Sequence, residues 1–446
     1  MSDGSVDLTM GLVTSDSTSR EVLSEMLDHQ GVTYEVIPEM VRHKYPVVLV
    51  RGHSEREYET ARQASQNEQG IVDADQAADI AMVASRLQGK STSRDCFEPY
   101  VNDEEEKLLS AIRKAFFAAG LPLVRKWYWP SLAPACCVLT HDVDWFEYSP
   151  FHKRALAQSL NPARVSRLGY ERLVKGRDFG WNVPETIELE KSHGFKSTFL
   201  FQTSYGRADL YLERSAKMLR EESFEIALHG AGNSHKDKNA LHEETRALRK
   251  KTGVEPRGIR YHILKFDVPG TWEIEASAGI LYDATFCFNR FFGFRAEICF
   301  PYHPIIDSRL PIIELPTCFM DWTSLHRNQN ENEQQKVLNR ELETVLQYHG
   351  ALVVNFHNTY LNEMTFPTVF RTYRSLLTTV SARGLWVATA EECVRWWTLR
   401  ADTQIRPRLE GKDVRYDRSN IDIIVEIEGK EMLVVPAAGK PSNAAE

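Results

Sequence analysis

One run of the sequence places a histidine and two acids directly after an apolar stretch. It reads Leu139-Thr140-His141-Asp142-Val143-Asp144-Trp145. On an extended segment, residues two apart point the same way, so Asp142 and Asp144 are expected to face one pocket. Two carboxylates that close repel each other unless a cation or a shared proton relieves them, and a metal with a general base is one arrangement that uses both. The alternative interpretation is a turn in which the acids cap the following helix.

A second apolar run ends on His229 and continues into a loop of small residues that contains Asn233 and His235. Imidazole is the commonest neutral metal ligand. One carboxylate with two nitrogen or oxygen ligands from such a loop would leave coordination positions open for water, as catalytic zinc sites do. Taken alone, His229 could equally be a packed or surface histidine.

Two further segments carry polar residues at the ends of apolar runs. Arg260 lies in Gly258–His262, and His357 lies in Asn355–Asn358. An arginine at a strand end is a natural partner for a carboxylate. Each segment alone could be structural, but their occurrence in order, each at a strand end, favours a shared site.

Short apolar runs alternate with longer helical stretches from Cys136 onward, and this pattern predicts a parallel sheet with crossover helices. Seven strands over about 265 residues is a number that suits a barrel, whose active sites form at the carboxyl ends of the strands. The expected strands are Cys137–Thr140, Ser197–Gln202, Glu225–His229, Gly258–Tyr261, Ile312–Leu315, Leu352–Phe356 and Leu385–Ala388.

The chain of 446 residues is too long for one typical domain. Strand and helix patterns in residues 1–100 predict a small α/β domain, without a glycine-rich phosphate loop. Residues 101–134 are expected to form a helical connection with its main helix at Asp103–Ala119, and residues 135–400 the barrel. Ile421–Ile427 and Glu431–Val435 predict a β-hairpin within a C-terminal segment, 401–446, that ends in a polar tail.

Composition excludes several classes of protein. With 42% hydrophobic and 26% charged residues, the chain is typical of a globular protein. A net charge of −8 argues against a broad nucleic-acid-binding face. No run is long and apolar enough to span a membrane, and no secretory signal is visible, so a cytoplasmic location is expected. The seven cysteines have no regular spacing and are expected to be reduced and buried.

Taken in order, these motifs resemble those of the polysaccharide deacetylase (NodB-homology) family of carbohydrate esterases, over about 265 residues. The resemblance implies a distorted (β/α)7-type, NodB-like barrel. It also implies that Asp142 is the base, that Asp144 binds a metal, that Arg260 orients the base and that His357 protonates the leaving group. Met320-Asp321, after Glu314-Leu315-Pro316, resembles the fourth motif of the family, and Asp321 is expected to tune His357.

The second histidine of the family's metal motif is replaced here by Asn233, with His235 two residues later. Either residue is expected to complete the site with Asp144 and His229, around a divalent metal for which zinc is the first candidate. The resemblance implies hydrolysis of an N-acyl group, most simply N-acetyl, from an amino sugar or glycoconjugate. Two alternatives stay open: a metal-free amidohydrolase acting on a ureide or amide, and a non-catalytic carbohydrate-binding relative.

Overall fold

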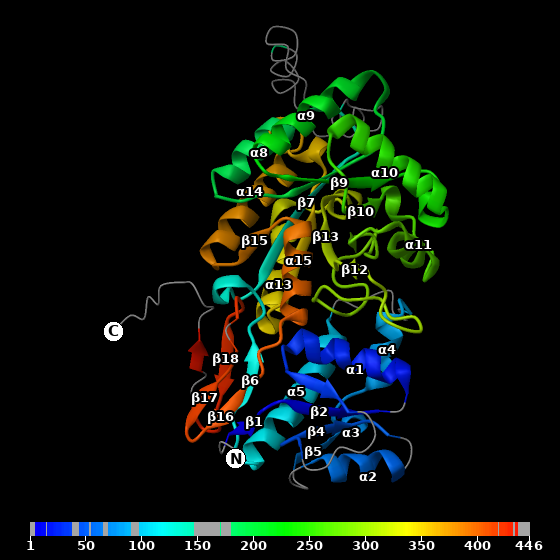
Figure 1. Cartoon of the computed structure of the whole chain (residues 1–446). Helices are drawn as coiled ribbons and strands as arrows, with labels where there is room; N and C mark the ends of the chain where they lie inside the picture. Colours follow the sequence, from blue (N-terminus) through cyan, green and yellow to red (C-terminus); the bar gives the residue numbers. More distant parts are fainter. Residues whose placement is uncertain are drawn as a thin grey trace.

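The computed structural model describes residues 5–14, 16–37, 44–52, 55–65, 70–90, 98–146, 170, 180–417, 419–430 and 433–435. The expectations for Cys96 and for the tail from Pro436 lie outside the described residues. Figure 1 shows two parts: a larger one in which helices surround a sheet, and a smaller one built mainly from the N-terminal strands and helices.

The larger part is built on a nine-stranded sheet. Its strands are β7 (Cys136–Val143), β8 (Thr198–Phe201), β9 (Glu225–Gly230), β10 (Gly258–Tyr261), β11 (Tyr282–Asp283), β12 (Ile313–Glu314), β13 (Thr317–Met320), β14 (Ala351–Asn355) and β15 (Trp386–Ala388). All seven expected strands are present with small shifts in their ends, and β11 and β13 are additional. Strand β7 is buried along its whole length, as expected for a central strand of a sheet covered on both faces.

The strand order shows that the sheet curls into a barrel. Neighbours follow the order β12-β11-β10-β9-β8-β7-β14-β13, with β15 paired to the start of β7, and every pairing among the described residues of this sheet is parallel. Only Leu315 and Pro316 separate β12 from β13, the two ends of this order. Such a link spans at most about 11 Å, so the two edges must nearly meet. The predicted fold class, a distorted parallel α/β barrel, is confirmed.

Crossover helices connect the strands and cover the outside of the barrel (Figure 1). They are α8 (Val183–Lys191), α9 (Asp209–Glu221), α10 (Lys238–Thr252), α11 (Gly270–Ala278), α13 (Glu331–Tyr348) and α14 (Pro367–Ala382). The short α12 (Asp321–His326) lies between β13 and α13, and α15 (Ala390–Asp402) follows β15. Short 3-10 helices follow several strands: η3 (Gly206–Ala208), η4 (Ser234–Lys236), η5 (His262–Leu264) and η6 (Asn358–Tyr360). Among the described residues, no helix combines the length and apolar character needed to cross a bilayer.

The N-terminal part is a small α/β unit with a parallel sheet in the order β3-β2-β4-β5. Its elements are β2 (Met10–Val13), α1 (Ser17–Gln30), β3 (Tyr34–Val36), β4 (Val48–Val50), α2 (Glu55–Ala64), β5 (Ile71–Asp73), α3 (Ala74–Ala77), α4 (Ile80–Leu87) and α5 (Tyr100–Ala118). Asp16 caps the start of α1, where its side chain accepts a hydrogen bond from the amide of Ser19, and Gly31 ends the helix in a left-handed conformation.

The segments on either side of the barrel pair with each other. Strand β6 (Leu123–Lys126), in the region expected to be a helical connection, pairs antiparallel with β18 (Ile423–Glu426), which forms the expected hairpin with β19 (Leu433–Val435). A second hairpin, β16 (Arg408–Glu410) and β17 (Asp413–Arg415), joins β1 (Val6–Asp7). η2 (Pro130–Leu132) leads from β6 into the barrel.

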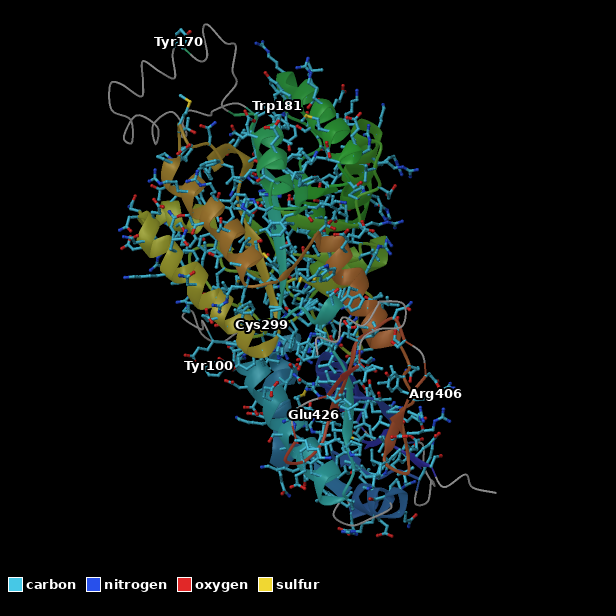
Figure 2. All side chains as sticks on the ribbon, turned by 90° about the vertical axis from the view of Figure 1, so that its left-hand side faces the viewer. Tyr100, Tyr170, Trp181, Cys299, Arg406 and Glu426 are labelled. Carbon is cyan, nitrogen blue, oxygen red and sulfur yellow. The ribbon has the colours of Figure 1, made fainter. Side chains whose placement is uncertain are left out.

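Polar contacts join the N-terminal unit to the barrel. Figure 2 shows Tyr100 and Cys299 near this junction, where the backbone amide of Cys299 donates to the side chain of Asn102 at 2.9 Å. Glu25 on α1 accepts from the backbone amide of His303 at 2.8 Å. The junction is therefore specific and hydrogen-bonded.

Candidate active site

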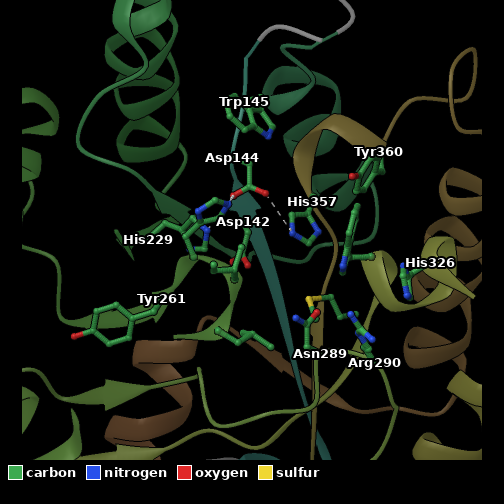
Figure 3. A pocket seen from close by; sticks show the side chains of 15 residues that line it. Asp142, Asp144, Trp145, His229, Tyr261, Asn289, Arg290, His326, His357 and Tyr360 are labelled. Atoms are coloured by element: carbon green, nitrogen blue, oxygen red, sulfur yellow. Dashed lines mark hydrogen bonds and ion pairs between the residues drawn. The ribbon is translucent and has the colours of Figure 1, made fainter. Parts of the chain in front are cut away.

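A cavity of about 370 Å³ opens at the carboxyl ends of the barrel strands (Figure 3). Parallel strands bring their carboxyl ends to one edge, so polar residues that are distant in the sequence converge there. The lining residues are Asp142, Asp144, Trp145, His229, Tyr261, His262, Ile263, Leu264, Asn289, Arg290, Met320, Trp322, His326, His357 and Tyr360. Four of the residues predicted for the site, Asp142, Asp144, His229 and His357, line this one cavity.

Asp142 is held in place from two sides. A guanidinium nitrogen of Arg260 donates to one carboxylate oxygen at 2.8 Å, and the side-chain amide of Asn355 donates to the other at 2.7 Å. Arg260 is fully buried, and it also donates to the hydroxyls of Thr140 and Thr317. Burial would raise the pKa of Asp142, but the charges of Arg260, His229 and His357 together outweigh it and hold that pKa below its ordinary value. Asp142 is therefore an ionised, oriented carboxylate at the cavity wall.

His357 and Asp321 form a buried dyad. The Nδ1 of His357 donates to one oxygen of Asp321 at 2.6 Å, and the backbone amide of His357 donates to the other at 2.8 Å. The Nε2 is thereby directed toward the cavity, 3.7 Å from an oxygen of Asp144. Burial would lower the pKa of His357, but the Asp321 carboxylate outweighs it and raises that pKa to about 9. His357 is therefore protonated at neutral pH, as a proton donor must be.

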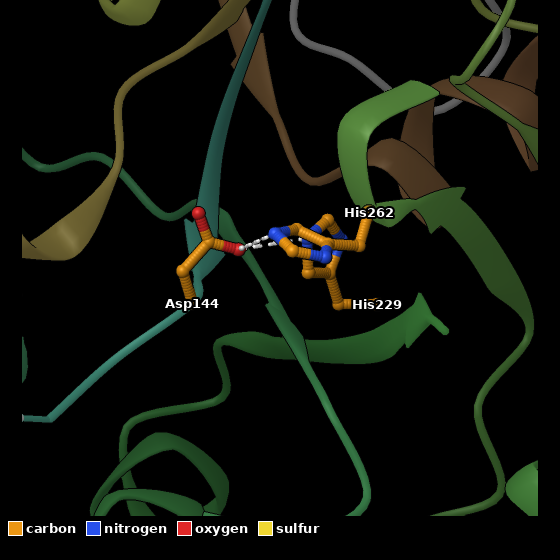
Figure 4. Close-up of side chains that lie close together, drawn as sticks. All are labelled: Asp144, His229 and His262. Carbon is orange, nitrogen blue, oxygen red and sulfur yellow. Dashed lines mark hydrogen bonds and ion pairs between the residues drawn. The ribbon is translucent and has the colours of Figure 1, made fainter. Parts of the chain in front are cut away.

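Asp144, His229 and His262 form a compact group of possible metal ligands (Figure 4). One ligand atom from each lies within 4.8 Å of the others. The Nε2 of His229 is 3.0 Å from Oδ1 of Asp144, and the Nε2 of His262 is 3.6 Å from the same oxygen. One carboxylate with two imidazoles is a donor set that suits zinc and related transition metals.

Hydrogen bonding at His229 fits a cation at this position. Its Nδ1 lies 2.9 Å from the carbonyl oxygen of Arg260, which can only accept, so Nδ1 carries a proton. In the neutral ring, Nε2 then presents a lone pair to the Asp144 carboxylate, and two acceptors face each other. Either a second proton on His229 or a metal ion resolves this conflict. The carbonyl contact also fixes the ring orientation, as the outer partners of metal-bound histidines do.

The structure does not bring Asn233 or His235 into this group. Asn233 is exposed at the start of η4. His235 packs beside the ring of Tyr261, and its Nε2 is 3.8 Å from a carboxylate oxygen of Asp267. After His229 the chain turns outward, and Ser234 is bound to Glu244 of α10 by its hydroxyl. That turn directs the loop away from Asp144.

Two residues that the sequence analysis did not assign to the site have direct roles in its geometry. Asn355 holds Asp142, and His262 takes the place expected for Asn233 or His235. The signal for His262 was its spacing from Arg260: the two residues alternate at a strand end, as Asp142 and Asp144 do. In the sheet, Arg260 is the register partner of His229. His262 lies two residues after Arg260, just beyond the end of β10, and is therefore close to His229 on β9.

The backbone that follows His262 is strained. Ile263 and Leu264 both have a φ of 55°, in the left-handed region that costs a branched residue free energy. Both side chains line the cavity, and Ile263 is 63% exposed. Such outliers are concentrated at functional sites, where the surrounding structure fixes them. The turn sets the position of His262 at the rim.

No protein-family model matches the chain, and no curated protein is similar to it in sequence. Several solved structures are similar to it in fold. One, described as a polysaccharide deacetylase from Mycobacterium smegmatis, is 19% identical, with a TM-score of 0.45 over 62% of this chain and 95% of that one. PuuE allantoinase is 15% identical, with a TM-score of 0.45 over 61% of this chain and 93% of its own.

A carbohydrate esterase family 4 pseudoenzyme from Bacillus anthracis is also similar, at 14% identity and a TM-score of 0.33, over 59% of this chain and 70% of that one. The names of these structures include the family expected from the motifs. At such identities and TM-scores, the likeness carries no information about the chemistry of this chain, which rests on its own residues.

Proposed function

We propose that this protein is a metal-dependent hydrolase that removes an acyl group, most simply N-acetyl, from an amino sugar or glycoconjugate. The observation that carries the proposal is the presence of an oriented, ionised Asp142 and a protonated His357 in the wall of one cavity. A base and an acid in one pocket are what hydrolysis of an amide requires, because water must lose a proton and the departing amine must gain one.

Each residue has a defined part in this reaction. Asp142 accepts the proton of the attacking water, and Arg260 and Asn355 keep its carboxylate ionised and aimed. His357 gives its Nε2 proton to the leaving nitrogen, while Asp321 holds the ring through Nδ1. Asp144, His229 and His262 would hold a divalent ion, with zinc as the first candidate. When bound, such an ion polarises the acyl carbonyl and lowers the pKa of its water.

The metal assignment is tested by measuring the metal content of the purified protein after loading with zinc and desalting. Wild type should hold about one ion per chain, and His262→Ala should lose most of it. His235→Ala is the matched control, because it removes a nearby histidine outside the group and should keep the metal. Loss of metal in His235→Ala but not in His262→Ala would overturn the assignment.

One observation favours a metal-free amidohydrolase as the second candidate. If His229 carries protons on both nitrogens, its Nε2 hydrogen bond satisfies Asp144 without a cation. Burial lowers the pKa of His229, but the carboxylates of Asp142 and Asp144 outweigh it and raise that pKa. Near-zero metal content in wild type, together with turnover of an amide or ureide, would support this candidate instead.

Catalysis is tested with Asp142→Asn, which keeps the shape of the side chain but cannot accept a proton. On a panel of N-acetylated and N-formylated sugars, we expect its rate to fall by about 10²–10⁴ while its metal content stays that of wild type. Wild-type activity in this variant would refute the assignment of the base. Lack of turnover by wild type on every substrate would favour the non-catalytic alternative.

A further inference from the structure

A second cavity, of about 400 Å³, lies at the junction between the N-terminal unit and the barrel. Its walls come from the end of α1 and the segment after it, from β6, from the barrel segment 303–309 and from the end of α15. It shares no lining residue with the candidate active site. The residues that matter here are Asp28, Lys126, His303, Arg309 and Asp402.

Lys126 is the unusual residue of this cavity. It is only 4% exposed, and its ammonium group donates to the backbone carbonyls of Ala401 at 3.0 Å and Thr403 at 3.2 Å. An ammonium has three hydrogens to donate, so one is left. Among the described residues, no carboxylate forms an ion pair with Lys126. Burial lowers the pKa of Lys126 to about 8, and the charge of Arg400 acts in the same direction, while the carboxylates of Asp28 and Asp402 offset only part of this effect.

A second buried cation adds to the positive potential here. Arg400, 1% exposed, donates only to backbone carbonyls, those of Trp127, Asp28, His29 and Lys126. Within the part of the chain that the structure describes, it too has no ion pair. Its guanidinium also lies over the rings of Tyr128, at 5.2 Å, and Trp397, at 4.9 Å. Buried charges are normally paired, so two adjacent cations without an ion pair leave positive charge that Asp28 and Asp402 offset only in part.

The other residues that line the cavity determine which further hydrogen-bonding groups a ligand must carry. Arg309 pairs with Asp28 at 2.7 Å and with Glu25 at 3.0 Å, yet its Nη2 is buried without a hydrogen-bond acceptor. The carboxylate of Asp402 also lines the cavity. A ligand must therefore present an oxyanion to Lys126 and donors, such as hydroxyl groups, to the acidic side.

We propose that this cavity binds a small hydroxylated oxyanion, a phosphorylated or carboxylated sugar or polyol, with Lys126 as its main anchor. The volume lies within the range of ordinary small-molecule sites. Because the cavity joins the two parts of the molecule, the ligand would bind only to the folded, assembled chain. The N-terminal unit thereby gains a function as one wall of a second binding site.

Calorimetric titration of the full-length protein with glucose, glucose 6-phosphate and glucuronate tests the proposal. These probes share one ring and differ in charge, so they separate phosphate, carboxylate and neutral ligands. We expect at least one charged probe to bind clearly more tightly than glucose. Lys126→Met should weaken that binding by about 10–100-fold, the usual effect of losing a charged hydrogen bond. Lys412→Met, which removes an exposed lysine in the turn between β16 and β17, should leave it unchanged.

Thr398→Trp is the second variant, because it fills the cavity from an exposed position on α15 and does not disturb a buried charge. It should also abolish binding of the charged probe, whereas His262→Ala in the candidate active site should not. The proposal is overturned if none of the probes binds at millimolar concentration, or if glucose binds as tightly as the charged probes. Binding that survives both Lys126→Met and Thr398→Trp would also overturn it.

Discussion

His29 at the junction predicts a specific dependence of stability on pH. It is 1% exposed, and its ring nitrogens contact Glu105 at 2.7 Å and Glu25 at 3.0 Å. Burial would lower the pKa of His29, but Glu105 and Glu25 outweigh it and raise the pKa from 6.5 to about 9. A proton bound more tightly in the folded state stabilises that state, fully below pH 6.5 and progressively less as pH rises through 9.

The size of the effect follows from this shift. A change of 2.5 units, from 6.5 to about 9, corresponds to about 3 kcal/mol in the free energy of unfolding. Between these limits His29 should contribute a loss of about 1.4 kcal/mol per pH unit. Lys126 acts in the opposite direction above pH 8, because burial lowers its pKa to about 8 and folding then favours its neutral form. The contribution of His29 must therefore be measured as the difference in the free energy of unfolding between wild type and a His29 variant, since both proteins contain Lys126.

Urea unfolding of wild type and His29→Gln at several pH values from 6 to 9.5 measures that difference. Wild type should be the more stable by the largest margin near pH 6, and the margin should shrink by about 3 kcal/mol by pH 9.5. His242→Gln is the control, since it changes a half-buried helix histidine and should keep the wild-type pH profile. A margin that stays constant with pH would show that His29 is not the protonated partner of the two acids, and would refute this reasoning.

Three other predictions follow from single positions. Gly31→Ala should destabilise the fold by about 1–3 kcal/mol in urea, because φ is +70° and the new Cβ would lie 2.3 Å from the carbonyl oxygen of Lys126; an unchanged midpoint would contradict it. Ile263→Gly should raise stability by about 1 kcal/mol by relieving the left-handed strain, measured in the same way. Arg290→Gln should lower kcat/KM for N-acetylglucosamine 6-phosphate about tenfold and spare N-acetylglucosamine, because Arg290 lines the active-site cavity and has no carboxylate partner among the described residues.

The barrel could be predicted because its longer strands, such as β7, β8, β9 and β14, each contain a run of three or four apolar residues that leads into a polar residue. β7 and β14 are buried throughout, and such strands need no alternation to be recognised. The two strands that were not predicted, β11 and β13, lack a separate apolar run of this kind or follow another run too closely. β11 is only two residues long, and β13 begins directly after Pro316, where a run beginning at Ile312 was expected to end.

Pairing between distant segments could not be predicted. β6 lies beside β18, with Leu123 opposite Glu426, although some 300 residues separate them. Nothing in either short strand identifies the other, because pairing of this kind is decided by how the barrel between them brings its ends together. The same limit applies to the junction cavity, which depends on residues of α1, β6 and α15 that are brought together only by the fold.

The candidate site shows where sequence reasoning is strong and where it is weak. Strand ends are reliable positions, because a parallel sheet carries all its carboxyl ends to one edge; this is why Asp142, His229, Arg260 and His357 could be placed together. Positions in loops are not reliable in this way, because a single turn of the backbone decides whether a side chain points into the site. The short loop after His229 turns outward into η4, so Asn233 and His235 lie away from the strand ends. His262 directly follows β10, so its side chain points the same way as that of Arg260, two residues earlier. A metal ligand that immediately follows a strand has its position fixed by sheet register, whereas one that lies four or six residues into a loop depends on a conformation that spacing alone does not determine.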